Sequence, residues 1–232
     1  MNTLFLTIFN PQKAFNQIKV ETLSIMIFII IILLVLTNLI LMIPIHEKSF
    51  LITLTSKPLT PQQSNTMIEL NHKMRYLNVV VTGLLYVILF LFHAYILHLI
   101  ARVSKNKLAY MKVLQLLVYC NLIIVLGDLI NTALLYWRGI DNIEHAYDII
   151  LTGITHFISI EQVGTTGYVF LNSINLFQLW FVVLLSIGFR ILTDIKPVKS
   201  IVISIFFWLI TILIPVLFVY FSQSTLAKNG AM

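Results

Sequence analysis

The chain has 232 residues, of which 59% are hydrophobic and 10% charged, with a net charge of +6. A hydrocarbon core of roughly 30 Å requires about 20 helical residues, and five apolar runs reach that length. This composition excludes an ordinary soluble domain and predicts an all-α, polytopic membrane protein with five transmembrane helices and short amphipathic interfacial helices. The predicted spans are Leu23–Ile43, Leu77–Ile100, Val113–Leu135, Tyr168–Phe189 and Ile201–Phe221.

The remaining segments are too short to form a second domain. The longest stretches between spans have about 32 residues, too few to bury a core of their own, so residues 1–232 are predicted to form one membrane domain. The basic residues lie at span ends, which favours contact with the lipid bilayer and argues against nucleic acid as a partner. Cys120 is the single cysteine, so no intrachain disulfide is possible.

Residues 1–22 are predicted to contain a short helix. Asn10 before Pro11 is a helix-start signal, because Asn caps the first turn and the fixed φ of Pro suits the first helical position. Ala14, Phe15 and Ile18 then share one side. Two interpretations stay open: an interfacial segment on the inner leaflet, or an element packed against the bundle.

Both longer loops contain helical patterns. Thr60-Pro61 is a second start signal, and Met67 and Met74 belong to a helical stripe that runs into the second span, which predicts one long helix projecting from the membrane. In the second loop, an apolar stripe predicts an amphipathic helix around residues 141–158 on the outer surface, ahead of Gly164. The residues of this stripe are Ile143, Tyr147, Ile150, Leu151, Ile154, Phe157 and Ile158.

The distribution of Lys and Arg predicts the orientation. The segments 1–22, 101–112 and 190–200 carry nine basic residues in 45, whereas the opposite segments carry six in 75. The side richer in basic residues is expected to be cytoplasmic. The N-terminus is therefore predicted to be cytoplasmic and the C-terminus extracytoplasmic, in a multi-pass protein of the cytoplasmic cell membrane.

Asp128 is the acidic side chain inside a predicted span. An ionised Asp near the middle of a bilayer costs about 2.5–3.5 kcal/mol, so it should face protein or water. Asn121 and Asn131 lie on the same helical face, and together the three residues are a candidate intramembrane polar site. They could form an ion or proton relay, a substrate contact, or a set of hydrogen bonds between helices.

A second candidate set lies in the fourth span, where Asn172, Asn175 and Gln178 are interpreted as a polar stripe between helices. His93 and His98 point about 140° apart on one helix, which is unsuitable for shared chelation. No metal site and no cofactor is predicted. The sequence contains no glycine-rich phosphate loop and no G-x-S-x-G nucleophile motif, and we expect no catalytic residues and no enzymatic activity.

Three stretches together resemble the Yip family, the Ypt-interacting-protein-like membrane proteins with five spans. They are Asn10-Pro11 with Phe15, the segment from His98 through a short basic loop to Tyr119, and Asn175–Trp180 followed by Gly188 and a basic turn. The N-terminal region is short, which resembles the compact bacterial members and argues against the small-GTPase binding of eukaryotic members. The proline that usually follows the tyrosine-containing segment is missing after Tyr119.

The resemblance implies a non-enzymatic accessory protein that helps assemble or modulate other integral membrane proteins, and some bacterial relatives accompany ABC-type exporters. Our leading hypothesis is therefore an accessory or assembly subunit for a membrane transport complex, with a transporter permease as a candidate partner. The alternative is a small transporter or lipid-handling protein that uses the Asp128 face.

Overall fold

The computed structural model describes residues 7, 10–16, 21–55, 60–104, 108–142, 153–158 and 160–229. These residues form helices, joined by one isolated β-bridge between Gly153 and Asn175. The all-α fold is therefore confirmed. The helices are α2 (Pro11–Asn16), α3 (Glu21–Leu41), α4 (Ile43–Thr55), α5 (Pro61–Val103), α6 (Tyr110–Arg138), η1 (Ile140–Asn142), η2 (Ile154–Phe157), α7 (Ile160–Asn172), α8 (Leu176–Thr193) and α9 (Pro197–Asn229).

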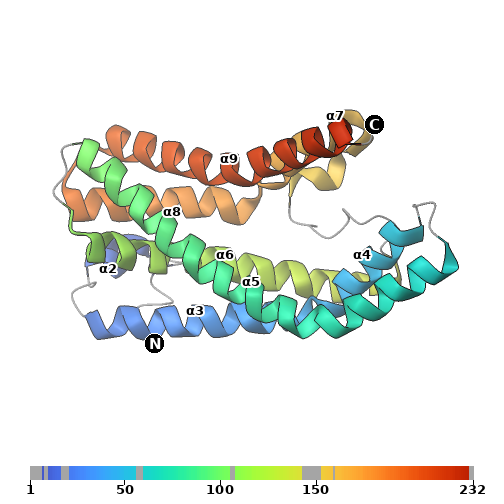
Figure 1. The fold of residues 1–232 in the computed structure, drawn as a ribbon. Coiled ribbons are helices and arrows are strands. Elements are labelled where there is room, and N and C mark those ends of the chain that lie inside the picture. The colour runs from blue at the N-terminus through green and yellow to red at the C-terminus, as the bar shows by residue number, and fades with distance from the viewer. Residues whose placement is uncertain are drawn as a thin grey trace.

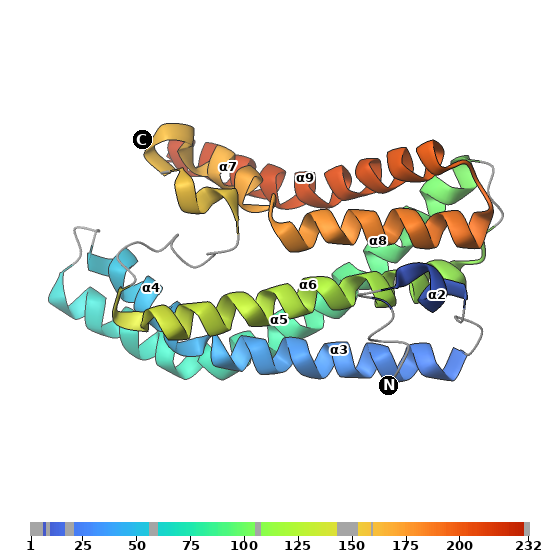
Figure 2. The same ribbon diagram turned by 180° about the vertical axis from the view of Figure 1, so that it is seen from behind.

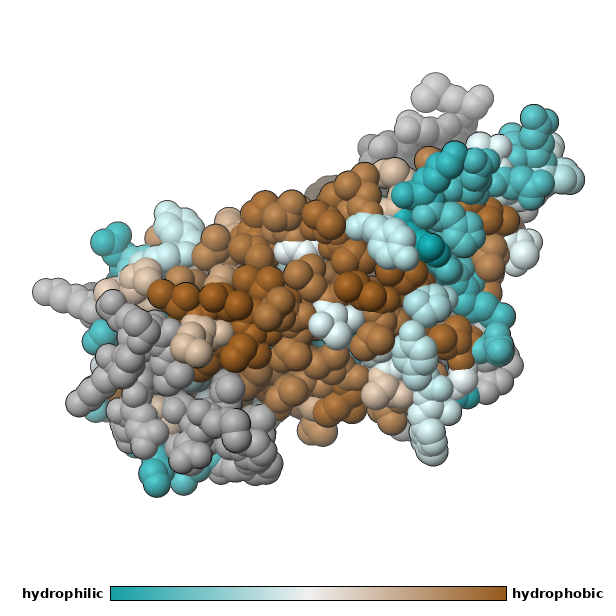
Figure 3. Space-filling model, turned by 90° about the horizontal axis from the view of Figure 1, so that it is seen from below, coloured by the Kyte–Doolittle hydropathy of each residue, from teal (hydrophilic) through white to brown (hydrophobic). Residues whose placement is uncertain are grey.

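Within the described residues, four helices are long and apolar enough to cross a membrane: α5, α6, α8 and α9. A fifth candidate is the pair α3 and α4, which are bent by 44° and pass the same test together. A polytopic membrane protein with four or five spans is thus confirmed. Figure 3 shows hydrophobic residues over the middle of the molecule and hydrophilic residues gathered at the end formed by α4 and the start of α5.

Helix α6 is the centre of the bundle. It contacts α3, α5 and α8, while α9 packs on the outer side of α8 (Figures 1 and 2). Tyr119 and Leu116 of α6 are fully buried, together with Phe189 of α8. More than half of the residues in the most apolar stretch of α6 are buried inside the chain. In the corresponding stretch of α5, only about a tenth of the residues are buried. Helix α5 therefore leaves more of its apolar residues accessible than α6 does.

Glycine allows two of these helices to approach closely. A Cβ atom added at Gly188 of α8 would overlap Leu116 of α6 and lie 3.0 Å from the ring of Phe15. Ala14 and Phe15 of α2 are buried, and the ring of Phe15 meets that of Tyr119 edge-on at 6.5 Å. Of the two interpretations of the N-terminal helix, packing against the bundle is the one observed.

Both predicted helix starts are confirmed. The side chain of Asn10 accepts a hydrogen bond from the amide of Lys13 at the start of α2. Thr60 and Gln63 form a reciprocal capping box at the start of α5. Helix α5 has 43 residues, or about 65 Å at 1.5 Å per residue, so it is the single long helix expected to extend beyond the membrane.

Helix α4 was not predicted, because the first span was ended at Ile43 and the next helix start was placed at Thr60-Pro61. Pro44 explains why the chain bends here. It has no amide hydrogen to donate to the backbone carbonyl of Ile40, and its ring crowds that carbonyl. The chain therefore turns at Met42 and starts a new helix at Ile43, bent by 44° from α3. The apolar run ends near the bend, whereas the helical backbone continues past it.

The prediction of one continuous fourth span over Tyr168–Phe189 is wrong. Helix α7 ends at Asn172, and α8 starts at Leu176 after a break whose last residue, Asn175, is extended. The predicted outer helix is contradicted at its described end, where Ile154–Phe157 is a 3-10 turn followed by an extended Ile158. Residues 143–152 lie outside the described residues.

Candidate functional site

Two of the three residues in the first candidate set lie near the same side chain of α5. Asn121 of α6 donates a hydrogen bond to the hydroxyl of Tyr86 on α5, and Asp128 lies close enough to interact electrostatically with the same Tyr86. Asn131 is 8% exposed and faces the bundle interior. Tyr86 is thus the common neighbour of Asn121 and Asp128, and it went unnoticed because a single Tyr in an apolar run carries no pattern.

The Asp128 side chain is exposed on the surface of the chain. It lies four residues from the middle of α6, or about 6 Å along the axis. The chain's own interior therefore does not cover Asp128, and the expectation that this side chain faces protein or water stays a prediction. Facing lipid, an ionised Asp would cost about 2.5–3.5 kcal/mol, so this position favours a covering polar group or water.

A different pair of helices is joined one turn further along α6. The hydroxyl of Thr132 donates to Oδ1 of Asn38 on α3 at 2.7 Å. Thr132 is buried, and the bond crosses the interface between α3 and α6. Asn38 and Thr132 therefore form an interhelical hydrogen bond, the kind of contact that was one of the alternatives for Asn121, Asp128 and Asn131.

The second candidate set is corrected in its geometry. Asn172, Asn175 and Gln178 do not form a stripe on one helix, because the helix breaks between the first two. Asn172 accepts a hydrogen bond from Thr155 at 2.8 Å, and Asn175 caps α8 by accepting from the amide of Gln178 at 2.9 Å. Asn175 is a helix-start residue followed by an apolar run, a signal that could have been read from the sequence.

One residue of each set lines a shared cavity of about 250 Å³ in the middle of the bundle. Asn121 of α6 and Gln178 of α8 meet there with His93 of α5. Pro215 of α9 and Thr211 also line the cavity. Because proline has no amide hydrogen, Pro215 cannot donate a helical hydrogen bond to the backbone carbonyl of Thr211. His93 meets Phe207 edge-on. The cavity is thus polar on several sides but does not include Asp128.

No cluster of three or more His, Cys, Asp or Glu side chains that could hold a metal ion exists among the described residues. His98 packs edge-on against Tyr110, away from His93, and Cys120 is fully buried. The chemistry available in the described part of the bundle is therefore hydrogen bonding and ion pairing by neutral amides, hydroxyls and a few charged groups.

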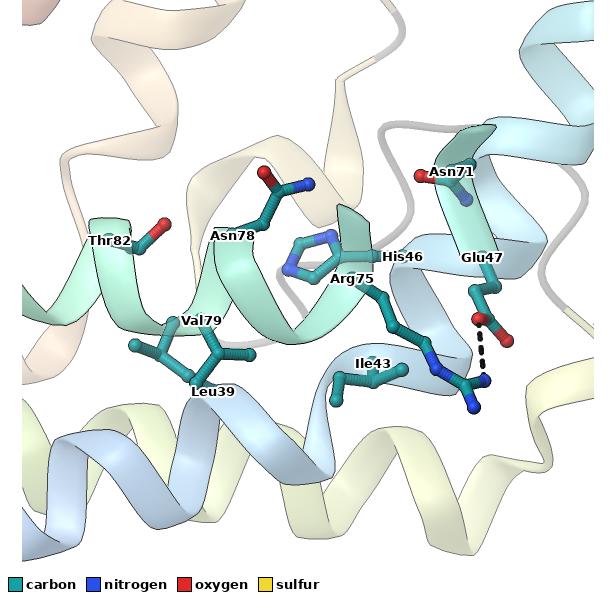
Figure 4. Close-up of a pocket in the computed structure, with 9 residues that line it drawn as sticks. All are labelled: Leu39, Ile43, His46, Glu47, Asn71, Arg75, Asn78, Val79 and Thr82. Carbon is teal, nitrogen blue, oxygen red and sulfur yellow. Dashed lines mark hydrogen bonds and ion pairs between the residues drawn. The ribbon is translucent and has the colours of Figure 1, made fainter. Parts of the chain in front are cut away.

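A second pocket, of about 350 Å³, lies between α4 and the first half of α5 (Figure 4). We call it the α4–α5 pocket. Glu47 accepts from Arg75 Nη1 at 3.3 Å, and the same oxygen lies 3.3 Å from Nδ1 of His72. Its lining residues are Leu39, Ile43, His46, Glu47, Asn71, Arg75, Asn78, Val79 and Thr82.

The α4–α5 pocket was missed because its parts come from segments that appeared unrelated. The bend at Met42 directs α4 along α5, and the long α5 carries Asn71, Arg75 and Asn78 at spacings of four and three, on one face. Without the helix α4 there was no reason to place Glu47 beside Arg75. The spacing of the three α5 residues was the only available signal.

Comparison with known proteins identifies one relationship. The family model of the Yip1 domain matches residues 5–218. No curated protein and no solved structure matches the chain. The matched range extends from the segment before α2 into α9, so it includes both cavities and every candidate site residue.

Proposed function

The chain belongs to the Yip1 domain family, and we propose that it is a non-enzymatic accessory protein that assembles or modulates a membrane transport complex such as an ABC-type exporter. Yip1 family proteins are generally non-enzymatic membrane proteins. We further propose that residues 1–232 form one such domain, in the cytoplasmic membrane, with a cytoplasmic N-terminus and an extracytoplasmic C-terminus.

The observation that carries this proposal is the exposed Asp128 near the middle of α6. An ionised Asp that contacted lipid at this position would cost about 2.5–3.5 kcal/mol, and a polar group from a second membrane protein would remove that cost. Tyr136, about 80° from Asp128 around the axis of the same helix, is also exposed. This part of α6 therefore has the mixed polar and apolar character of a contact between membrane helices.

The exposed face of α5 supports the same proposal. Nine exposed apolar residues recur alternately three and four positions apart along it, the spacing at which one helix packs along another. They are Met67, Leu70, Met74, Leu77, Val81, Leu84, Ile88, Leu91 and Tyr95, and we call them the α5 seam.

The α5 seam is longer than lipid tails can cover. It spans 29 residues, or about 42 Å, whereas the hydrocarbon core is roughly 30 Å thick. Only a tilt beyond the usual range of 0–40° would place all of it in the core. Met67, Leu70 and Met74 therefore favour a partner whose helix also continues past the membrane.

The test is affinity purification of the full chain, expressed at its native level, in a mild detergent. Wild-type protein should recover a stoichiometric integral membrane partner, and Asp128→Leu should lose most of it while the chain itself stays folded. Val202→Ala, which alters an exposed residue of α9, is the matched control and should retain the partner. A clean monomer or a homo-oligomer in the wild-type sample would contradict the proposal.

The second candidate function is a small transporter or lipid-handling protein, and the cavity between Asn121, Gln178 and His93 favours it. Its volume of about 250 Å³ is large enough for a small polar molecule or several waters. Under this alternative, filling the cavity with Ser173→Phe should abolish function and leave partner recovery unchanged. Under the leading proposal, function and partner recovery should either both persist or both be lost in this variant.

A further inference from the structure

The α4–α5 pocket has a polarity gradient along its length. Leu39 and Val79 lie at one end, and Glu47 and Asn71 lie at the other (Figure 4). The apolar end is formed where α3 finishes and where the apolar part of α5 begins. Along α5 the lining residues run from Asn71 to Thr82, about 16 Å at 1.5 Å per residue.

This gradient matches the boundary of a bilayer. Each interfacial layer is roughly 5–8 Å thick, since a bilayer of about 40–45 Å contains a core of about 30 Å. A pocket of about 16 Å that passes from charged to apolar residues therefore covers both a headgroup and the first part of an acyl chain. A fully polar, water-soluble ligand would make no favourable contact with the apolar end of the pocket.

The charged end of the pocket presents one positively and one negatively charged side chain, Arg75 and Glu47, to a ligand. The Nε atom of Arg75 is buried and has no acceptor among the described residues, although Nη1 is bonded to Glu47. Both side chains that contact Glu47, Arg75 and His72, use its Oε1 atom, which leaves the other carboxylate oxygen for a ligand. Arg75 can thus bind a phosphate while Glu47 binds an ammonium group.

Neutral donors complete the set. The side chains of His46, Asn71 and Asn78 line the pocket and make no hydrogen bond to other described residues. Figure 4 shows the imidazole of His46 between Asn78 and Arg75, with the Arg75–Glu47 contact beside it. Amide and imidazole N–H groups are suitable donors to phosphate and ester oxygens.

We propose that the α4–α5 pocket binds a zwitterionic aminophospholipid, with the phosphate at Arg75 and the ammonium group at Glu47. The acyl chains leave along Leu39, Ile43 and Val79 toward the membrane core. This site is independent of any protein partner, so it stands or falls separately from the accessory function.

The test is native mass spectrometry of the full chain in detergent, with phosphatidylethanolamine, phosphatidylcholine or phosphatidylglycerol added at equal concentration. Wild-type protein should bind phosphatidylethanolamine most tightly, because its primary ammonium donates hydrogen bonds to a carboxylate and a quaternary one does not. Loss of one charged hydrogen bond corresponds to a decrease of about tenfold or more, so Arg75→Gln should weaken binding by that factor.

The matched control is Lys73→Gln. Lys73 lies on the same helix and forms an exposed ion pair with Glu69, but it does not line the pocket. It should leave lipid binding unchanged. Glu47→Gln keeps an acceptor for Arg75 and should abolish the preference for phosphatidylethanolamine over phosphatidylglycerol. Because Arg75→Gln could loosen α4, Asn78→Leu provides a second variant that leaves the Arg75–Glu47 contact in place.

Two results would overturn the proposal. One is equal binding of the three lipids by wild-type protein, or equal binding by the Arg75→Gln and Lys73→Gln variants. The other is displacement of the lipid by soluble phosphoethanolamine at a comparable concentration, which would assign the pocket to a free headgroup compound. Failure of soluble phosphoethanolamine to compete, together with loss of lipid in Asn78→Leu, supports the lipid site.

Discussion

At the scale of single residues, polar side chains in the spans have three different roles. Asn121 and Thr132 join helices by hydrogen bonds, and Asn175 starts a helix. Asp128 is exposed. The sequence predicted polar contacts for Asn121, Asp128 and Asn175, because a polar group in an apolar run requires a partner, whereas Thr132 was not singled out. It could not assign those partners, since Tyr86 and Asn38 lie on other helices.

Asp128 is expected to tolerate neutral replacement within the isolated chain. Asp128→Asn and Asp128→Leu should both express at the wild-type level, because they remove a charge whose side chain is not packed in the core. The free energy of unfolding, measured by heating in detergent, should change by less than about 1 kcal/mol for either variant. A large loss of stability in Asp128→Leu would show that Asp128 is a structural partner of Tyr86.

Gly188 should be intolerant of even one added methyl group. An added Cβ overlaps Leu116 and touches Phe15, so Gly188→Ala should lower the free energy of unfolding by about 1–3 kcal/mol. Gly83→Ala is the matched control, since its added Cβ meets only the tip of the flexible Leu36 side chain at 2.8 Å. Heating in detergent followed by size-exclusion chromatography measures both, and equal effects would contradict the packing described for α2, α6 and α8.

At the scale of elements, predictions succeeded where a local signal marks a helix end. Thr60 and Asn10 cap their helices as expected, because capping depends on residues within one turn. The α7–α8 break was missed because Asn172 and Asn175 were interpreted as a polar stripe between helices, although Asn175 before an apolar run is also a helix-start signal. The helix α4 was missed because apolar run length was taken as helix length, while Pro44 starts a new helix beyond the run.

Thr60 should control the stability of the first turn of α5. Thr60→Ala removes the acceptor for the amide of Gln63 and costs about 1 kcal/mol. Hydrogen exchange of the amides in residues 62–65 should accelerate about fivefold, the factor that corresponds to that energy. Thr66→Ala, whose hydroxyl bonds only to the carbonyl of Gln62, serves as the control and should leave exchange at the helix start unchanged.

At the scale of the whole molecule, the polytopic membrane class followed from the lengths of the apolar runs, because the bilayer imposes the length of an apolar helix, and the five predicted spans compare with four or five candidate spans in the described residues. The arrangement of the helices did not follow, since close contacts such as that at Gly188 depend on side-chain shape. The α4–α5 pocket likewise requires the bend at Met42, which brings α4 beside α5. The sequence of either helix alone does not predict the pocket.

The orientation can be tested with single cysteines in a Cys120→Ala background. Positive charge is expected on the cytoplasmic side, so a cysteine at Lys196 should be protected from an impermeant thiol reagent in intact cells. A cysteine at Glu69, whose side chain is 68% exposed at the opposite end of the bundle, should be labelled. The reverse pattern would invert the proposed topology and leave the fold unchanged.

The most direct test of the accessory function is photocrosslinking from the part of the α5 seam that extends past the membrane. A photoreactive residue at Leu70, in cells that express the chain at its native level, should crosslink to one integral membrane protein of a transport complex. The same residue at Asn65, which is exposed but turned about 140° away, should not. Crosslinks from Leu70 only to lipid, or equal crosslinking from both positions, would contradict the account.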